Sequence, residues 1–490
     1  MKMLKRMSAF GACALLVLSV MLGFTACFEV DNPNLDENGQ PNQIVTEIDY
    51  DVTATLKVAY KSENSEKAIV QSLADGFKKI FKNVTVELVA YNDGTANAIT
   101  KLYNAKTMPD IFMSDSFSML TLSATKGLLL NFTPYIEQEI KAGNFALEDY
   151  YDAYMRLGQI GFNGAQCMIP RSADRVVCHI NKKLIREVEE ETGKEILSKI
   201  HNGWTWEEFY EVCDLLKEGS TFKKSGRFLL DGEIKWEAVW NPVFKSYGVE
   251  YFDKDGNVAI DSEATKQALD HFKYWVSQGY CASPTSGMSA DFEYGKGAFY
   301  FNSMAASQEI KTLIEAYKDT DDAFTVENAS NTYDVVTMPV KADNPLIGAG
   351  AAGYCGYAGS ENPALVWQFM KYLLTKDGQN AIADSGVNYV PVRKDMADYT
   401  DSENNHWGKG YENINLQAYV YKSGELLEDG SYNDDWNCNT DYFNVKGSKY
   451  AVDLNAGVST FVTSYAAGSK SYETVLNTLK KTWDAALKKR

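Results

Sequence analysis

The 490-residue chain carries 48 basic and 66 acidic residues, which gives a formal net charge of −18. This acidity argues against nucleic acid and against an anionic membrane surface as direct partners. Hydrophobic residues at 45% and aromatic residues at 13% exclude a disordered protein, and the length is sufficient for two hydrophobic cores.

The N-terminus has the pattern of a secretory signal. Basic residues precede an apolar run, residues 7–24, which ends at two small residues before Cys27. The string FTAC resembles a bacterial lipobox, in which the cysteine is acylated and becomes the first residue of the mature protein. We therefore expect residues 1–26 to be a lipoprotein signal peptide and Cys27 to be lipidated. The alternatives are an ordinary signal peptide and an uncleaved membrane anchor.

Residues 27–53 are polar, acidic and without hydrophobic period. We expect them to form a flexible tether, which as a coil would reach about 28 Å. A tether between a lipid and a folded body predicts a protein anchored at the extracytoplasmic face of the cell membrane.

Strands and helices alternate in the next block. Strand patterns at 53–60, 84–91 and 110–115 enclose amphipathic helix patterns at 65–81 and 94–106. This order predicts a parallel sheet. Ligands bind beyond the carboxyl ends of the strands in open sheets of this kind.

Small polar residues follow these strand ends. Ser114, Asp115 and Ser116 end the third strand, and Ser62 and Glu63 follow the first. We expect all five to contact a ligand, because their hydroxyl and carboxylate groups form directed hydrogen bonds. The alternative is that Asp115 or Ser116 caps the following helix.

The rest of the chain continues as α/β without internal repeat. Thr205, with Glu208 three residues on, predicts a capping box at a helix start. The other predicted elements are a strand and helix after Pro170, a strand ending at Asn302 and Ser303, a strand at 333–340, a helix pair at 361–386 and a C-terminal helix at 471–490.

Four strings, in order, resemble the extracellular solute-binding proteins of ABC importers, in their maltose-binding-like branch. The resemblance implies a type II periplasmic-binding-protein fold: two α/β lobes, each a mostly parallel sheet flanked by helices, with the ligand cleft between them. The strings are PDIFMSDSFSMLTLSATKGLLLNFTPYI (109–136), NGWTWEEFYEVCDLLK (202–217), YGKGAFYFNS (294–303) and ENPALVWQFMKYLLTKDGQNAIADSGVNYVPVRKD (361–395).

The same resemblance implies how the chain divides between the lobes. We expect an N-terminal lobe of residues 54–158 and 296–348, and a C-terminal lobe of residues 159–295 and 349–490. The expected crossings between the lobes lie near residues 155–165, 290–297 and 345–352.

Further site residues come from positions that match the family. Arg171 is expected in the cleft, with a hinge ion pair as the alternative. Trp236 and Trp240, four apart, would share a helix face as an aromatic platform, although such pairs also form cores. Gly350 and Tyr354 lie at the last crossing, where a glycine lets backbone approach a ligand.

Asn302 and Ser303 fall where the family often has Asn-Gly followed by an aromatic residue. Met304 and Ala305 follow here instead, which puts a stacking ring at that place in doubt.

The resemblance predicts a solute-binding component that captures a carbohydrate, an oligosaccharide by preference, and delivers it to a permease. We expect a monomer whose partners are the sugar, the ABC permease subunits and, through its lipid, the membrane. No cofactor, metal or catalytic residue is expected, and the protein is not expected to be an enzyme. The alternatives are a polyamine, a peptide or another small solute as ligand, and a secreted glycan-degrading enzyme, since carboxylates are abundant.

Two features leave alternatives open. The aromatic-rich segment 400–455 either lines the cleft or packs as a surface elaboration. Cys167 and Cys178 flank a possible hairpin and form either a disulfide or two free buried thiols.

Overall fold

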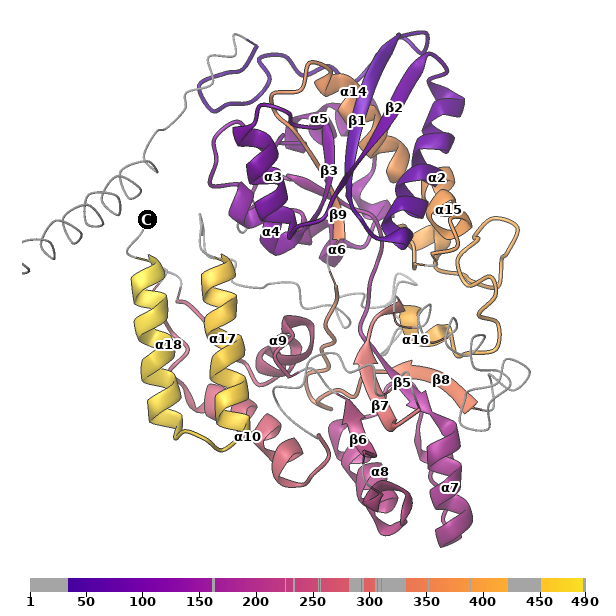
Figure 1. The fold of residues 1–490 in the computed structure, drawn as a ribbon, viewed down its shortest axis with the longest axis vertical. Helices are drawn as coiled ribbons and strands as arrows, with labels where there is room; N and C mark the ends of the chain where they lie inside the picture. The colour runs from indigo at the N-terminus through magenta and orange to yellow at the C-terminus, as the bar shows by residue number, and fades with distance from the viewer. Residues whose placement is uncertain are drawn as a thin grey trace, which may run out of the picture.

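The computed structural model describes residues 34–487 with internal gaps, and these residues form two lobes (Figure 1). We call the upper lobe in that view the first lobe and the lower one the second lobe. The positions inside this range that are not described are 161–163, 225, 232–233, 254, 256, 282–291, 293–294, 305, 307–309, 311–331, 351, 388 and 422–450.

The first lobe is built on a five-stranded sheet. Its strands, in order across the sheet, are β2 (Val84–Tyr91), β1 (Ala54–Lys61), β3 (Ile111–Asp115), β9 (Ala352–Gly356) and β4 (Met168–Pro170). β1 pairs in parallel with β2 and β3, while β9 pairs antiparallel with β3 and β4. The parallel core β2-β1-β3 confirms the prediction from the alternating pattern.

Helices surround this sheet (Figure 1). α2 (Asn64–Ile80) buries Ile69, Leu73 and Phe77, which form the apolar stripe that its sequence period predicts. The other helical segments of this lobe are α3 (Thr95–Asn104), α4 (Ser116–Leu122), α5 (Thr133–Ala142), η1 (Leu147–Asp149), α6 (Asp152–Leu157), α14 (Pro363–Leu373), α15 (Lys376–Asp384) and η5 (Lys394–Met396).

The second lobe has a four-stranded sheet in the order β6 (Phe228–Asp231), β7 (Gly297–Asn302), β5 (Val177–Asn181) and β8 (Tyr333–Thr337). Only β6 and β7 pair in parallel, so the prediction of a mostly parallel sheet is wrong for this lobe. Its helical segments are α7 (Lys182–Thr192), η2 (Leu197–Lys199), α8 (Trp206–Glu218), η3 (Thr221–Lys223), α9 (Glu237–Ser246), α10 (Glu263–Ser277), α16 (Gln417–Val420), α17 (Ala451–Ala466) and α18 (Tyr472–Leu487).

The predicted capping box starts α8. The Thr205 hydroxyl accepts a hydrogen bond from the Glu208 backbone N–H at 3.3 Å, and the Glu208 carboxylate accepts one from the Thr205 N–H at 2.7 Å. Two backbone N–H groups that lack helical partners are thereby satisfied.

The chain divides between the lobes differently from the expectation. β7 and β8 pair in the second sheet, so the assignment of residues 296–348 to the first lobe is wrong. β9, α14 and α15 belong to the first lobe, so residues 349–490 are not a single second-lobe block. A buried strand pattern shows that a strand will be covered, but it does not show which sheet supplies its hydrogen-bond partners.

The described crossings lie at residues 171–176, between β4 and β5, at residues 338–350, between β8 and β9, and at residues 397–416, between η5 and α16. The expected crossing near 345–352 falls at the second of these. The expected crossing near 155–165 is wrong, because the chain leaves the first sheet only after β4. The expected crossing near 290–297 is also wrong, because α10 before it and β7 after it both belong to the second lobe.

Residues 34–53, predicted to be part of a flexible tether, dock on the first lobe instead. The Gln40 side chain donates to the Leu129 carbonyl at 2.9 Å and accepts from the Asn131 backbone N–H at 2.8 Å. This paired contact imitates the two hydrogen bonds of a short β-bridge, which the polar sequence did not reveal. We call residues 34–53 the strap. Residues 27–33 lie outside the described part, where the tether stays a prediction.

The five cysteines that the structure describes are free and buried: Cys167, Cys178, Cys213, Cys281 and Cys355. Cys167 precedes β4 of the first sheet, whereas Cys178 lies in β5 of the second sheet. Cys167 and Cys178 therefore form no disulfide with each other, and the alternative of two free buried thiols is the one observed.

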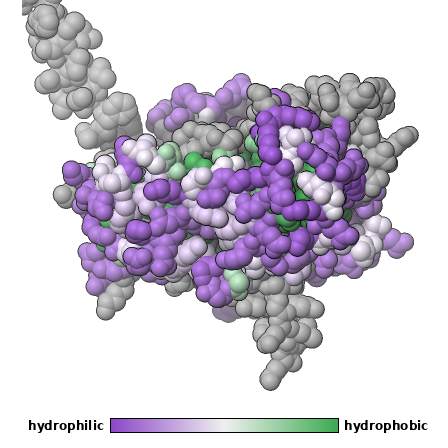
Figure 2. All heavy atoms as spheres, turned by 90° about the horizontal axis from the view of Figure 1, so that it is seen from below, coloured by the Kyte–Doolittle hydropathy of each residue, from purple (hydrophilic) through white to green (hydrophobic). Residues whose placement is uncertain are grey.

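Hydrophilic residues dominate the described surface when the molecule is seen from below, from the second-lobe end (Figure 2). Within the described ranges, no helix combines the length and the apolar composition needed to cross a bilayer.

An aromatic cluster in the second lobe encloses a buried histidine. The Trp206 ring lies 4.8 Å from His271 and 5.1 Å from Trp275, measured between centroids. Tyr210 hydrogen-bonds the His271 ring at 3.1 Å. Burial lowers the pKa of His271 to about 3 and that of His179 in β5 to about 4.

These histidines predict a loss of stability in mild acid. Both are neutral in the folded chain but gain a proton below pH about 6.5 when unfolded, so stability is complete above that pH and falls as the pH drops toward 4. Urea titrations between pH 7.5 and 4.5 should show this decline, and His271→Gln should reduce its slope. His201→Gln, at an exposed position, is the control for the substitution itself. An unaltered slope in His271→Gln would contradict the assignment.

Candidate functional site

The carboxyl ends of three parallel strands form one edge of the first sheet, which faces the second lobe (Figure 1). Ser62 and Glu63 follow β1 at this edge and are exposed. The Ser62 N–H donates to the Tyr91 carbonyl at 2.8 Å, and Glu63 pairs with Lys61 at 2.6 Å. Both predicted residues thus lie where the strand ends place them.

Asp115 caps α4. One carboxylate oxygen accepts from the Ser118 N–H at 2.8 Å and the other from the Ser118 hydroxyl at 2.6 Å. The capping alternative is therefore observed, and Asp115 still remains partly exposed at the edge. Ser114 and Ser116 are buried, with exposed fractions of 0% and 6%, so Asp115 is the residue of this trio that is available to a ligand.

Tyr91 was not predicted, although it ends β2 at the same edge. Its hydroxyl donates to the Met113 carbonyl at 3.1 Å and lies 3.2 Å from the Thr95 hydroxyl. Burial raises the pKa of Tyr91 to about 12, so the phenol stays protonated as a donor. The signal in the sequence was an aromatic residue directly before a polar strand end.

Two crossing segments pair with each other between the lobes. The Arg171 N–H donates to the Ala352 carbonyl at 3.1 Å, and the Gly350 N–H donates to the Asp174 carbonyl at 2.7 Å. The Ala173 N–H donates to Val390 at 2.8 Å, which adds a third segment. The lobes are therefore joined by paired backbone.

Arg171 is tied to the first lobe by its side chain. The guanidinium is ion-paired with Glu66 in the first turn of α2, and both side chains are buried. It also lies over the Tyr389 ring, 5.0 Å from the centroid. Burial alone would lower the pKa of Arg171, but the Glu66 carboxylate outweighs this and raises it. The structure therefore shows the alternative for Arg171, an ion pair at the hinge. The sequence did not indicate that Glu66 is its partner.

Asp174 lies in the first crossing segment and was not among the site residues predicted from the sequence. Its carboxylate accepts hydrogen bonds from the Ser303 side chain and the Met304 backbone, yet its Oδ1 oxygen is buried without a hydrogen-bond partner among the described residues. Burial raises the pKa of Asp174 to about 6, against the opposing effects of Ser303 and the Arg171 charge. An unpartnered buried carboxylate oxygen is costly unless a ligand hydroxyl or a water donates to it.

Gly350 fits closely against this carboxylate. A Cβ atom at Gly350 would lie 2.6 Å from Asp174 Oδ2, so any other residue there would have to displace the carboxylate. The glycine therefore lets this crossing approach the Asp174 side chain of the other crossing segment, and the predicted approach of its backbone to a ligand stays a prediction.

Asn302 and Ser303 end β7 beside this crossing, because Asn302 pairs with Val177 in register. Both are buried. The structure therefore brings Ser303 to Asp174 from the second-lobe side, and Asn302 lies next to it.

The two tryptophans predicted to form an aromatic platform have different environments. Trp240 is fully buried against Phe244 and Tyr251, so a platform role for it is wrong: the aromatic neighbours cover its ring. Trp236 precedes α9 at the N-cap position and is partly buried, so it is not part of the helix that carries Trp240. Trp236 stays a candidate.

Tyr354 is fully buried in the middle of β9, between Met113 and Ile169. Burial raises the pKa of Tyr354, although the nearby Arg171 opposes this. The position is covered by flanking strands, so the predicted ligand contact is wrong for this residue.

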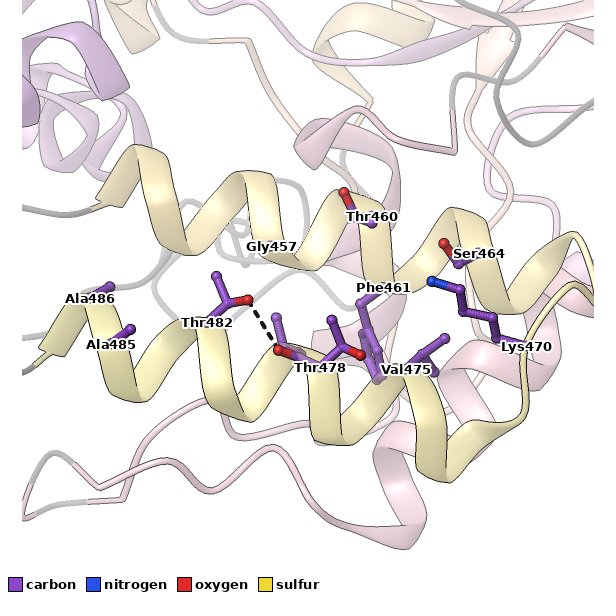
Figure 3. Close-up of a pocket in the computed structure, with 11 residues that line it drawn as sticks. Gly457, Thr460, Phe461, Ser464, Lys470, Val475, Thr478, Thr482, Ala485 and Ala486 are labelled. Atoms are coloured by element: carbon purple, nitrogen blue, oxygen red, sulfur yellow. Dashed lines mark hydrogen bonds between the residues drawn. The ribbon is translucent and has the colours of Figure 1, made fainter. Parts of the chain in front are cut away.

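Two cavities lie away from this cluster. One, of about 490 Å³, runs along the seam of α17 and α18 (Figure 3), where the Thr482 hydroxyl donates to the Thr478 carbonyl at 3.0 Å. The other, of about 420 Å³, is lined by Lys371 and Arg393, which are ion-paired with Glu139 and Asp395. Neither cavity adjoins the strand ends or the crossing segments described above.

The described part of the chain contains no cluster of three or more His, Cys, Asp or Glu side chains able to hold a metal ion. The predicted lipidation site Cys27 lies outside the described residues, as do residues 422–450 of the aromatic-rich segment. Trp407, Tyr411 and Tyr419 of that segment are buried, which fits the packed alternative for its first part.

Removing one partner of the Glu66–Arg171 ion pair should cost far more stability than replacing both partners by apolar residues. Glu66→Gln leaves the buried guanidinium without a counter-ion and should lower the free energy of unfolding by about 3–5 kcal/mol. The double variant Glu66→Leu/Arg171→Met should recover most of this loss in urea denaturation. Glu63→Gln, at the exposed pair with Lys61, is the matched control and should change little. A double variant as unstable as Glu66→Gln would contradict this account.

Comparison with known proteins supplies independent evidence. The model of the family described as bacterial extracellular solute-binding protein matches residues 72–408. No curated protein matches the chain.

Solved structures share the fold at low identity. The GacH receptor of Streptomyces glaucescens, solved unliganded and with acarbose, is 18% identical over 89% of this chain and 99% of its own, with a TM-score of 0.61. The sugar-binding protein MalE of Xanthomonas citri is 15% identical over 89% and 98%, with a TM-score of 0.66. Lmo0181 of Listeria monocytogenes, in complex with cycloalternan, is 16% identical over 89% and 99%, with a TM-score of 0.60.

Proposed function

The chain belongs to the bacterial extracellular solute-binding proteins, and on that premise we propose that it captures a carbohydrate, by preference an oligosaccharide, between its lobes and delivers it to an ABC permease. The observation that supports the proposal is the Asp174 carboxylate at the place where the lobes meet, one oxygen of which is buried with no partner in the described part of the chain. Structural neighbours in complex with acarbose and with cycloalternan support the ligand class.

The chemistry of the surrounding groups suits a neutral polyhydroxyl ligand. Asp115 and Glu63 offer carboxylate acceptors at the sheet edge, and Asp174 offers one at the crossing. Carboxylates accept directed hydrogen bonds from sugar hydroxyls, and a partly buried ring such as Trp236 can pack on the apolar side of a pyranose.

We propose binding without turnover, by a monomer that needs no cofactor. The family and the structural neighbours are binding proteins. Acylation of Cys27 would hold the protein at the extracytoplasmic face of the membrane, beside its permease.

Calorimetry over malto-oligosaccharides, polyamines and peptides tests the ligand class. We expect heat of binding with an oligosaccharide and no release of shorter sugars on prolonged incubation. Binding of a polyamine or a peptide alone would overturn the carbohydrate proposal, and turnover would show that the protein is an enzyme.

Asp174→Asn should weaken saccharide binding by about 1–3 kcal/mol, because the amide replaces one acceptor oxygen by a donor. In the wild type, affinity should rise from pH 5 to pH 7 as the carboxylate ionises around pH 6, and Asp174→Asn should lose that dependence. Calorimetric titrations at each pH measure both effects. The exposed Asp484→Asn on α18 is the control. Equal affinity of the Asp174→Asn variant and the wild type would remove Asp174 from the site.

A further inference from the structure

We propose that His179 is a positioning residue of the solute site: from the interior of the second lobe it holds the end of β7, so that Ser303 donates to the Asp174 carboxylate. His179 does not touch the ligand in this account and acts through Ser303. The inference rests on the proposed function, in which Asp174 accepts a hydrogen bond from the saccharide.

His179 lies on one face of the second sheet with three other polar side chains. β5, β7 and β8 lie side by side in this sheet (Figure 1), and the register pairs His179 with Tyr300. Asn302 comes two positions after Tyr300, and Tyr333 pairs with Asn181, two positions after His179. Because side chains alternate between the two faces of a strand, four of them project from the same face, and all four are buried: His179, Tyr300, Asn302 and Tyr333.

The hydrogen bonds of His179 determine where its ring proton lies. Its Nε2 atom is 3.2 Å from the Asn302 carbonyl oxygen, and its Nδ1 atom is 2.7 Å from the Tyr333 hydroxyl. A carbonyl oxygen can only accept, so Nε2 carries the proton and Nδ1 accepts from the Tyr333 hydroxyl. Burial lowers the pKa of His179 to about 4, so the ring keeps this neutral form at pH 7. The ring therefore links β8 to Asn302, the last residue of β7.

Asn302 is held at its backbone and at its side chain. Besides the bond from His179 to its carbonyl, its Oδ1 atom accepts from the Ser303 N–H at 2.7 Å, and its Nδ2 atom donates to the Tyr300 hydroxyl. The Asn302 carbonyl and the Ser303 N–H belong to one planar peptide unit, so fixing the carbonyl fixes the direction in which Ser303 leaves the strand.

Ser303 and the residue after it carry this order to the site. The Ser303 side chain and the Met304 backbone both donate to the Asp174 carboxylate. These two bonds and the charge of Arg171 favour the ionised carboxylate, whereas burial opposes ionisation and raises the pKa of Asp174 to about 6. A displaced Ser303 would therefore leave Asp174 less firmly held and more readily protonated.

Calorimetry with a malto-oligosaccharide between pH 5 and pH 8 tests the proposal. His179→Leu removes the donor to the Asn302 carbonyl, and we expect the midpoint of the pH dependence of affinity to rise by about one pH unit, because Asp174 loses a hydrogen bond that favours its ionised form. His179→Gln keeps a donor near the position of Nε2 and should restore most of the wild-type midpoint.

His271→Leu is the matched control. It removes another buried ring of the second lobe, one that hydrogen-bonds Tyr210 instead of a strand end, and should lower stability without moving the midpoint. An unmoved midpoint in folded His179→Leu protein, or an equal rise in His271→Leu, would overturn the positioning role.

A cycle of variants tests the route through Ser303. Ser303→Ala alone should raise the same midpoint, and His179→Leu added to it should raise it little further, because the bond that His179 positions is already gone. A full additional rise in the double variant would show that His179 does not act through Ser303.

NMR spectroscopy of the wild-type chain, labelled with nitrogen-15 in its four histidines, tests the network without ligand and also when His179→Leu fails to fold. The signals lost in His179→Gln identify the ring, which we expect to be neutral and protonated at Nε2 at pH 7. A ring protonated at Nδ1 would overturn the inference. A wild type that binds no oligosaccharide would overturn the proposed function, whereas binding with a midpoint indifferent to His179→Leu would overturn this inference alone.

Discussion

The buried ion pair of Glu66 and Arg171 is the constraint on which the relation between the lobes depends. Arg171 is the first residue of the segment that leaves the first sheet, and its counter-ion belongs to the helix that starts at the site edge. Removing two charges from water is costly, and the cost is offset only if the pair stays closed. The first-lobe end of the crossing is therefore held in place.

Bending between the lobes must then occur after Arg171. The Gln379 side chain strengthens this hold, because it donates to the Arg171 carbonyl at 3.2 Å and accepts from the Val392 N–H at 2.8 Å. Asp174 and Gly350 come next along the paired crossings, where a small rotation carries the second lobe with Ser303. Hinge closure of this kind brings two walls onto one ligand.

The sequence predicted what depends on local pattern. The β-α-β order predicted the parallel strands and their polar edge, the capping box predicted the start of α8, and the resemblance in four strings predicted the family that the domain model matches. Asp115 lies at the predicted edge for the same reason, because the end of a parallel strand can be recognised from a short continuous stretch of sequence.

What the sequence could not show depends on contacts between distant residues. Glu66 reads as an ordinary first-turn acid of α2, and only the fold brings Arg171, 105 positions later, against it. Trp240 and Tyr354 have the residue types of a sugar site, but neighbouring rings and strands cover them. The strap has a polar, aperiodic sequence because its docking uses backbone and amide groups instead of an apolar stripe.

The central claim is that two lobes joined at residues 171–176 close on a captured oligosaccharide. Small-angle X-ray scattering of the mature chain, without and with saturating malto-oligosaccharide, tests it most directly. Closure predicts a smaller radius of gyration in the presence of the saccharide, with no change in molecular mass. An unchanged radius of gyration with the saccharide demonstrably bound would contradict the account.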